Sequence, residues 1–216
     1  MTTERIGVFG GTFDPVHIGH LIVATELRFA LALDRVLFVP AGRPPHKTGQ
    51  EVSPDEHRLA MLELALADAP GFEISRVDID RVGPSYTVDT LAILRQELDS
   101  AALVFLMGED SLRDLPTWRD PNGIAKLAEL GVARRPAVAY DLGEVLRAVP
   151  AARGRIHLVE VPEIGIAASD LRRRVASGHP ISYQVPRTVE SYIYEHGLFQ
   201  LCGGVRRGKP GQEHWR

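Results

Sequence analysis

The start of the chain combines three features that together leave few folds open. The short apolar run Ile6-Gly7-Val8-Phe9 is typical of a buried strand, and the apolar spacing over residues 18–32 is typical of a helix. Between them, residues 10–20 read Gly-Gly-Thr-Phe-Asp-Pro-Val-His-Ile-Gly-His. A Gly-Gly pair lets the backbone approach a ligand closely, and the start of a helix presents unpaired N–H groups and the positive end of a dipole. We therefore expect a strand–turn–helix unit whose turn binds an anion.

Strand-like and helix-like segments alternate along the rest of the chain. The predicted strands cover residues 5–9, 35–40, 73–79, 102–107, 130–134 and 156–161. The predicted helices cover residues 18–32, 54–68, 87–98, 121–128, 141–148, 169–176 and 187–195. This alternation predicts an α/β protein with a Rossmann-like, doubly wound parallel sheet. Ligands of such sheets bind beyond the carboxyl ends of the strands, and the polar clusters of this chain follow its predicted strands.

The chain is long enough for one domain, which we expect to span residues 1–200. Residues 203–216 are rich in Gly, Pro and charge, and we expect a disordered tail there. Within the domain, Ser53-Pro54-Asp55-Glu56 predicts a capping box with proline at the first helical position. Residues 83–85, Gly-Pro-Ser, predict a turn ahead of a helix that begins at Thr87.

Composition restricts the class of protein and its compartment. Hydrophobic residues make up 44% of the chain and charged residues 25%, which is typical of a soluble globular protein. The net charge of −3 gives no overall basic field, so nucleic acid is not an expected partner. No apolar stretch is long enough for a membrane span, and residues 1–5 leave no room for a signal peptide before the first strand. Cys202 is the only cysteine, so we expect no internal disulfide and a reducing, cytoplasmic location.

His17 and His20 are three residues apart, so both are expected on one face of the first turn of the helix. The helix dipole opposes a positive charge at this end, whereas an anionic ligand favours it. This placement suits a polyphosphate held by backbone amides and two imidazoles. A purely structural Gly-rich turn remains an alternative, and so does a metal site, although no third ligand is evident.

Two other phosphate-binding motifs are excluded by their spacing. Residues 7–11 do not fit the G-x-G-x-x-G fingerprint of dinucleotide-binding folds. Residues 42–48 approach a Walker loop, but His46 stands where that motif needs glycine.

Residues 10–20 resemble the phosphate-binding signature of the nucleotidylyltransferases, and in this full form that of the bacterial nicotinate-mononucleotide adenylyltransferases. The His-x-Gly-His core alone is shared with phosphopantetheine adenylyltransferases, cytidylyltransferases and class I aminoacyl-tRNA synthetases. The resemblance implies adenylyl transfer from ATP to nicotinate mononucleotide, which gives deamido-NAD and pyrophosphate. It also implies Mg²⁺ bound mainly through the ATP phosphates, with no metal ligand assigned on the protein.

The loop after the second predicted strand reads Pro-Pro-His-Lys over residues 44–47. Its prolines favour an extended backbone that presents His46 and Lys47 as cations. Taken alone, this is an ordinary solvated loop. It is similar to a loop of the same family in which the lysine approaches phosphate, which implies that role for Lys47.

Two features follow the fourth predicted strand. Gly108-Glu109-Asp110 either begins a helix capped by Asp110 or supplies a carboxylate for ribose hydroxyls or magnesium, as the Gly-x-Asp segment of the family implies. Trp118 alone would be read as a core residue. The resemblance implies that it stacks on the pyridine ring. Arg119 stands where the family usually has an aromatic residue.

Residues 85–90, Ser-Tyr-Thr-Val-Asp-Thr, match the Ser-Tyr-Thr-x-Asp-Thr element of the family. Backbone amides at a helix start can bind a carboxylate, which nicotinate has and nicotinamide lacks. After the fifth predicted strand, Arg134-Arg135-Pro136 resembles the Arg-Arg-Pro of the family. The two arginines fit a basic pair on the surface equally well.

Residues 166–172 resemble the Ile-Ser-Ser-Thr-x-x-Arg pattern, an N-capped helix that binds ATP phosphates. Ser169 and Arg172 keep their positions, whereas Ala167 and Ala168 replace two serines. The side-chain donors of those serines are therefore missing, and only backbone N–H groups are left at the two positions.

The resemblance runs in family order from Gly10 to Arg172 and implies a set of site residues. The implied catalytic residues are His17, His20, Lys47 and Arg172. The implied ATP-binding residues are Gly10, Gly11, Thr12, Phe13, His17, His20, Gly108, Asp110, Ser169 and Arg172. The implied substrate-binding residues are Lys47, Ser85, Tyr86, Thr87, Trp118, Arg119 and Arg134. A phosphopantetheine-type adenylyltransferase and a non-catalytic nucleotide-binding protein are the alternatives.

Overall fold

A computed structural model describes residues 3–43, 52–134 and 141–200 of the chain. Cys202 and the tail expected over residues 203–216 therefore lie outside the described residues, as do His46 and Lys47.

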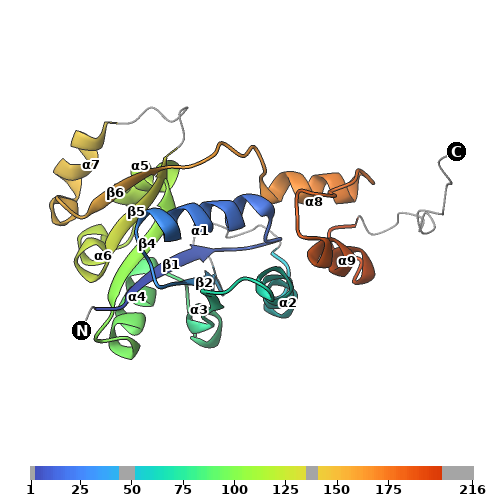
Figure 1. Cartoon of the computed structure of the whole chain (residues 1–216), viewed down its shortest axis with the longest axis horizontal. Coiled ribbons are helices and arrows are strands. Elements are labelled where there is room, and N and C mark those ends of the chain that lie inside the picture. The colour runs from blue at the N-terminus through green and yellow to red at the C-terminus, as the bar shows by residue number, and fades with distance from the viewer. Residues whose placement is uncertain (1–2, 44–51, 135–140, 201–216) are drawn as a thin grey trace, which may run out of the picture.

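Six parallel strands form one sheet in the order β3-β2-β1-β4-β5-β6 (Figure 1). The strands are β1 (Arg5–Gly11), β2 (Arg35–Pro40), β3 (Phe72–Ile74), β4 (Ala102–Gly108), β5 (Glu129–Arg134) and β6 (Ile156–Glu160). The order runs outward from β1 in both directions, which is the doubly wound arrangement. The predicted fold class is confirmed.

Helices cover the sheet on both faces. One hydrophobic cluster receives side chains from α1 (Ile18–Ala30), α2 (Asp55–Leu66), α8 (Ala168–Ala176) and α9 (Arg187–Glu195). A second cluster receives side chains from α4 (Thr87–Glu97), α5 (Glu109–Asp114), α6 (Pro121–Leu127) and α7 (Leu142–Ala148). The 3₁₀ helices Leu115–Thr117 and Pro150–Ala152 also pack against the second cluster. In Figure 1, α8 and α9 lie beyond the end toward which β1 points.

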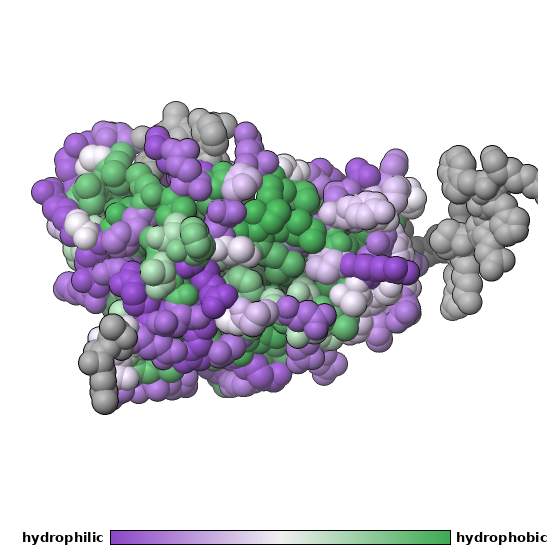
Figure 2. Space-filling view, in the orientation of Figure 1, coloured by the Kyte–Doolittle hydropathy of each residue, from purple (hydrophilic) through white to green (hydrophobic). Residues whose placement is uncertain are grey.

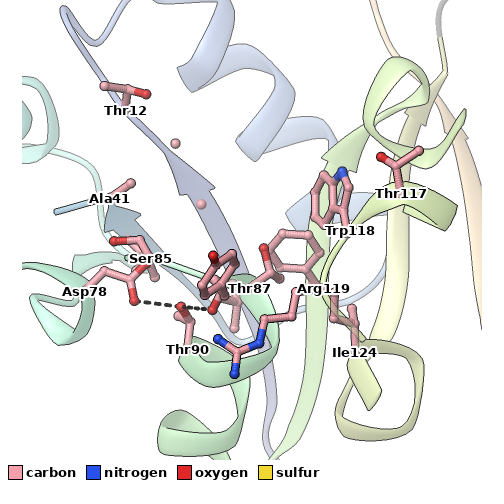
Figure 3. Close-up of a pocket in the computed structure, with 16 residues that line it drawn as sticks. Thr12, Ala41, Asp78, Ser85, Thr87, Thr90, Thr117, Trp118, Arg119 and Ile124 are labelled. Atoms are coloured by element: carbon pink, nitrogen blue, oxygen red, sulfur yellow. Dashed lines mark hydrogen bonds between the residues drawn. The ribbon is translucent and has the colours of Figure 1, made fainter. Parts of the chain in front are cut away.

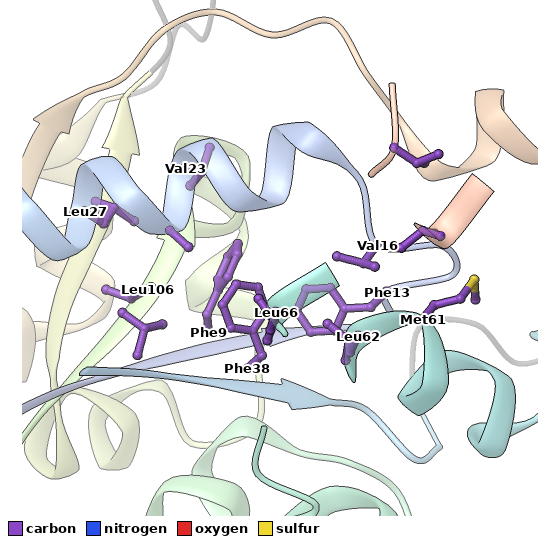
Figure 4. Close-up of a cluster of buried hydrophobic side chains, with 14 of the residues drawn as sticks. Phe9, Phe13, Val16, Val23, Leu27, Phe38, Met61, Leu62, Leu66 and Leu106 are labelled. Carbon is purple, nitrogen blue, oxygen red and sulfur yellow. The ribbon is translucent and has the colours of Figure 1, made fainter. Parts of the chain in front are cut away.

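The pleat of the central strands divides their side chains between the two clusters. Val8 and Leu37 enter the second cluster, whereas Phe9 and Phe38 enter the first. Strands buried on both faces read as continuous apolar runs, which is why residues 6–9 and 36–39 carry so clear a signal. In the first cluster the rings of Phe9 and Phe38 lie 5.4 Å apart, under α1 (Figure 4).

The structure corrects the strand predicted over residues 73–79. β3 ends at Ile74, and residues Val77–Asp80 form the short helix α3. Apolar and acidic residues alternate over 77–80, which is the pattern typical of a half-buried strand. The helix is favoured by an Arg76–Asp80 ion pair at i,i+4 spacing, with 2.9 Å between nitrogen and oxygen. The helix α5 was not predicted, because six residues are too few to show a period.

The capping box predicted at Ser53 is wrong. Helix α2 begins at Asp55, its N-cap is Pro54, and no side chain caps it. The backbone of Ser53 is used elsewhere: its N–H donates to the Asp14 carboxylate at 3.2 Å, and its carbonyl accepts a bond from Arg58. The helix start predicted at Thr87 is confirmed, since α4 begins at that residue.

The surface mixes polar and apolar residues. Figure 2 shows hydrophobic residues gathered over the middle of one face, with hydrophilic residues around them. Phe29 and Val82 are among the large apolar side chains that lie exposed. Within the described ranges, no helix is both long enough and apolar enough to cross a membrane.

Candidate active site

A cavity of about 480 Å³ lies at the carboxyl end of β1, where the strand order reverses (Figure 3). Its walls come from the end of β1, from the loop after β2, from the start of α4 and from the segment between α5 and α6. Eight predicted site residues line it: Gly10, Gly11, Thr12, Ser85, Tyr86, Thr87, Trp118 and Arg119. The fold therefore gathers segments that are up to 109 residues apart in the sequence.

The two glycines of the turn have different reasons to lack a side chain. A Cβ at Gly11 would lie 2.8 Å from the Phe13 ring, so packing alone requires glycine there. A Cβ at Gly10 would lie 3.6 Å from the Phe105 ring, which is an ordinary contact. Packing does not demand glycine at Gly10, so we infer that the bare backbone there leaves room for a ligand.

His17 and His20 lie face to face at the start of α1. Their ring centroids are 3.7 Å apart, with 24° between the ring planes. The sequence predicted both histidines in the first turn of the helix, but His17 is the extended N-cap residue (φ −144°) that precedes it. The backbone N–H of His17 donates to Nδ1 of His20 at 3.2 Å. Because Nδ1 accepts, a neutral His20 ring carries its proton on Nε2 and can donate from that nitrogen.

The turn between β1 and α1 is held by contacts from distant helices. Phe13 adopts a left-handed backbone conformation (φ 51°), which is disfavoured for a residue with a side chain. The carbonyl of Asp14 accepts a bond of 2.7 Å from Nη1 of Arg172. Arg172 is thus placed at the predicted phosphate turn, next to the elements that carry the two histidines.

The start of α8 lacks the hydroxyl groups typical of the family pattern. Ala167 is the N-cap, and no side chain caps the helix. Ser169 is exposed in its first turn. At positions 167 and 168, only backbone N–H groups can therefore donate hydrogen bonds to an anion.

The start of α4 forms one wall of the cavity. Oγ of Ser85 accepts bonds from the backbone N–H groups of Gly42 (3.0 Å) and Arg43 (3.2 Å), so this hydroxyl ties the loop after β2 to the wall. Tyr86 is the N-cap of α4, and no side chain caps the helix. Backbone N–H groups point toward the N-terminus of a helix, and the N-terminus of α4, at Thr87, borders the cavity.

Trp118 lies across the cavity from Ser85, and the side chain of Arg119 extends toward the start of α4 (Figure 3). Trp118 packs edge-to-face on Phe105 with ring centroids 6.1 Å apart. It is therefore partly buried against the second hydrophobic cluster and also lines the cavity. The Arg119 guanidinium lies 4.6 Å from the centroid of the Tyr86 ring, and its Nη1 lies 3.5 Å from Asp89. These contacts fix a cation at the cavity wall.

Not every predicted site residue lines this cavity. Phe13 is buried in the core, and His17, His20, Ser169 and Arg172 also lie outside the lining. Three further predicted residues, Gly108, Asp110 and Arg134, lie at or just after the ends of β4 and β5 and are likewise outside it. Gly108 is the N-cap of α5, so Asp110 does not cap that helix; its exposed carboxylate lies 3.5 Å from Arg113. Arg134 lies 3.5 Å from the buried carboxylate of Glu109.

Arg58 was missed by the sequence reasoning. Its side chain is fully buried and donates a bond of 2.8 Å to the carbonyl of Thr12. The available signal was a charged residue on the apolar face of α2, in register with the buried Leu62. Two of its acceptors are backbone carbonyls, those of Thr12 and Ser53, which nothing in the sequence names, and the third is the Asp55 carboxylate three residues earlier in the chain.

Comparison with known proteins first gives the class. The family described as cytidylyltransferase-like matches residues 8–174 of the chain. The nicotinic acid mononucleotide adenylyltransferase of Plasmodium falciparum, solved as a complex with NaAD, has a TM-score of 0.75. That similarity covers 91% of this chain and 97% of that one at 16% identity, and it shows a common fold. The fold is that of a nucleotidyltransferase.

Close relatives then give the family. A probable nicotinate-nucleotide adenylyltransferase of Thermomicrobium roseum is 62% identical over 197 residues, which are 91% of this chain and 92% of that protein. A protein of the same name from Thermus thermophilus is 46% identical, over 91% of this chain and 100% of its own length. The chain belongs to the nicotinate-nucleotide adenylyltransferase family, a family of enzymes.

Proposed function

We propose that this enzyme transfers the adenylyl group of ATP to nicotinate mononucleotide and so forms deamido-NAD and pyrophosphate, a step of NAD biosynthesis. The observation that carries the proposal is the cavity that joins the glycine turn of β1 to a wall of Tyr86, Thr87 and Trp118. One end offers backbone to phosphates, and the other offers an aromatic ring and a helix start to a pyridine carboxylate. A cytoplasmic location is part of the proposal, in line with a single cysteine.

The acceptor needs little chemical activation. The second pKa of a phosphate monoester is about 6, so the phosphate of nicotinate mononucleotide is largely dianionic at neutral pH. One of its oxygens attacks the α-phosphorus of ATP, the bond from that phosphorus to the bridging oxygen breaks, and pyrophosphate leaves with the electron pair. No general base is required. Catalysis then consists of alignment and of stabilising the negative charge in the transition state.

We assign that stabilisation to the start of α1 and the start of α8. His20 donates from Nε2 while its Nδ1 is held by the backbone of His17, so its proton is fixed in direction. Arg172 adds a planar guanidinium at the same turn. Lys47 is assigned a phosphate contact from the sequence, since it lies outside the described residues.

The two nucleosides are assigned to different edges of the site. Gly108 is the last residue of β4 and Asp110 lies in the first turn of α5. Both are proposed to bind the ATP ribose, with Ser169 at the phosphates. Tyr86, Thr87, Trp118 and Arg119 are proposed to bind the pyridine nucleotide, together with Ser85 and Arg134. The helix start at Thr87 would face the carboxylate, and the Trp118 indole would stack on the ring.

Magnesium is proposed to act through the ATP phosphates. No group of three metal-ligating side chains occurs among the described residues, so a resident all-protein metal site is not the basis of the proposal. The turn nevertheless has a suitable oxygen: Oδ1 of Asp14 is buried, with no hydrogen-bond partner in the described part of the chain. One carboxylate with phosphates and water is a common ligand set for Mg²⁺. The ion, when bound, would neutralise charge on the phosphate oxygens.

The direct test is incubation with ATP, Mg²⁺ and a panel of acceptors, with pyrophosphate release and the adenylylated product measured. We expect turnover with nicotinate mononucleotide, less with nicotinamide mononucleotide, and none with phosphopantetheine. Preferential use of phosphopantetheine would assign the chain to the other branch of adenylyltransferases. ATP binding without turnover of any acceptor would indicate a nucleotide-binding protein without this activity.

A further inference from the structure

Arg58 is a charged side chain without exposed surface. Its exposed fraction is 0%, and it projects from the first turns of α2 into the protein. Nη1 donates to the carbonyl of Thr12 at 2.8 Å, Nε donates to the carbonyl of Ser53 at 3.1 Å, and Nη2 pairs with the Asp55 carboxylate. A buried guanidinium is unfavourable unless its donors are satisfied. These three acceptors are therefore what makes the position tolerable for arginine.

The Thr12 carbonyl lies immediately before the strained residue of the turn. Phe13 has a φ of 51°, a conformation that persists in a non-glycine residue only when its surroundings hold it. Arg58 bonds the carbonyl on the N-terminal side of Phe13, and Arg172 bonds the carbonyl of Asp14 on its C-terminal side. The two guanidinium groups thus hold the backbone on both sides of Phe13.

The conformation of Phe13 also sets the surroundings of the histidine pair. The Phe13 ring, labelled in Figure 4, is 2% exposed. It lies edge-to-face on the His20 ring, with centroids 5.1 Å apart. The backbone just before it, Gly11 and Thr12, lines the cavity. A shift of the Thr12 carbonyl would therefore move the cavity wall and the packing of His20 together.

We propose that Arg58 is a positioning residue for the phosphates of the nucleotide. By fixing the Thr12 carbonyl, it holds residues 11–14 and the His20 ring in the geometry that receives the triphosphate. Arg58 itself does not touch substrate. The inference rests on the proposed function only in taking ATP as the phosphate ligand.

The test compares two variants with a matched control. Arg58→Lys keeps the charge but loses the planar fork, so it cannot bond both carbonyls as arginine does. Arg58→Gln removes the charge and can still donate to one carbonyl, so it stays informative if the lysine variant does not fold. The control is Arg95→Lys in α4, because Arg95 likewise donates to two backbone carbonyls, those of Ala101 and Leu127, before the start of β4 and at the end of α6.

Each variant is assayed below its own melting temperature for kcat, for KM of both substrates and for ATP affinity by calorimetry. We expect both Arg58 variants to weaken ATP binding and to lower kcat/KM for ATP by about 10- to 100-fold. Arg95→Lys should lower the melting temperature with less than a twofold change in these constants.

Two results would overturn the inference: wild-type kcat/KM and ATP affinity in a folded Arg58 variant, or an equal loss in Arg95→Lys. The ATP affinity is measured without an acceptor. A wild-type protein that binds ATP but does not turn over nicotinate mononucleotide would therefore count against the proposed function and leave the test of Arg58 intact.

Discussion

The carbonyl of Asp14 and the guanidinium of Arg172 meet at 2.7 Å, although 158 residues separate them in the sequence. The contact joins the turn after β1 to helix α8. In doing so it places a cation beside the predicted phosphate site, at the carboxyl end of the sheet. A phosphate entering the turn would meet both the N–H groups of α8 and this guanidinium.

Arg172→Ala should raise KM for ATP by about 10- to 100-fold, because a hydrogen bond to a charged group contributes about 1.5–3 kcal/mol. KM for the pyridine nucleotide should change much less. Arg173→Ala is the matched control, since Arg173 is exposed on the same helix and pairs with Asp170. Steady-state kinetics with each substrate varied in turn provide the measurement. An unchanged KM for ATP and kcat would reduce residues 166–172 to an ordinary helix start.

Restoring the missing hydroxyls should have a small effect of opposite sign. The double variant Ala167→Ser/Ala168→Ser should lower KM for ATP. Each new bond should add at most about 1 kcal/mol to the binding free energy, because it replaces a bond to water. Calorimetric titration with ATP measures the gain directly. A large gain would mean that the alanines limit affinity more strongly than the backbone geometry of α8 indicates.

Much of the fold could be predicted because buried parallel strands leave continuous apolar runs. Residues 6–9 and 36–39 show this, and the structure confirms both strands. The strand predicted over residues 73–79 is confirmed for 73–74 and wrong for 75–79, because Val77 and Ile79 alternate with acidic residues as a strand would. A tertiary contact also holds this short helix: Oδ1 of Asp78 accepts a bond of 2.6 Å from Thr90 of α4, which no local pattern reveals.

The sequence could indicate the candidate site where side chains match a family motif, as at His17, His20 and Trp118, and their roles stay predictions. The site was not predictable where side chains act on the backbone. Arg58 bonds the Thr12 carbonyl, and Oγ of Ser85 accepts two backbone N–H groups, so no partner residue type in the sequence displays either contact with the turn or the loop. The contact between the Arg119 guanidinium and the Tyr86 ring is likewise apparent only from the structure.

The histidine pair should be central to turnover. His17→Ala and His20→Ala should each lower kcat by about two to three orders of magnitude, the scale for losing a preorganised donor to developing charge. His157→Ala is a suitable control, because His157 lies on β6 and pairs with Glu129. Circular dichroism and melting curves establish that the variants are folded. A variant with near wild-type kcat would remove that histidine from the mechanism.

Trp118 should act on one substrate and not the other. Trp118→Ala removes the indole from the cavity wall, so KM for nicotinate mononucleotide should rise while KM for ATP changes little. Trp118→Phe keeps an aromatic face and should recover part of the loss. The comparison requires both KM values for both variants. A defect confined to ATP would move the pyridine ring away from this wall.

Arg119 should contribute to the preference for the acid over the amide. Its guanidinium is held between the Tyr86 ring and the Asp89 carboxylate, close to the helix start at Thr87. A carboxylate gains a charge-assisted interaction there that an uncharged amide does not. Arg119→Gln should therefore reduce the ratio of kcat/KM for nicotinate over nicotinamide mononucleotide by about 3- to 10-fold, since a half-exposed charge contributes modestly. Arg119→Lys should keep most of the ratio, and Arg113→Gln, on the surface of α5, should keep all of it. An unchanged ratio in Arg119→Gln would leave the backbone of α4 as the source of discrimination.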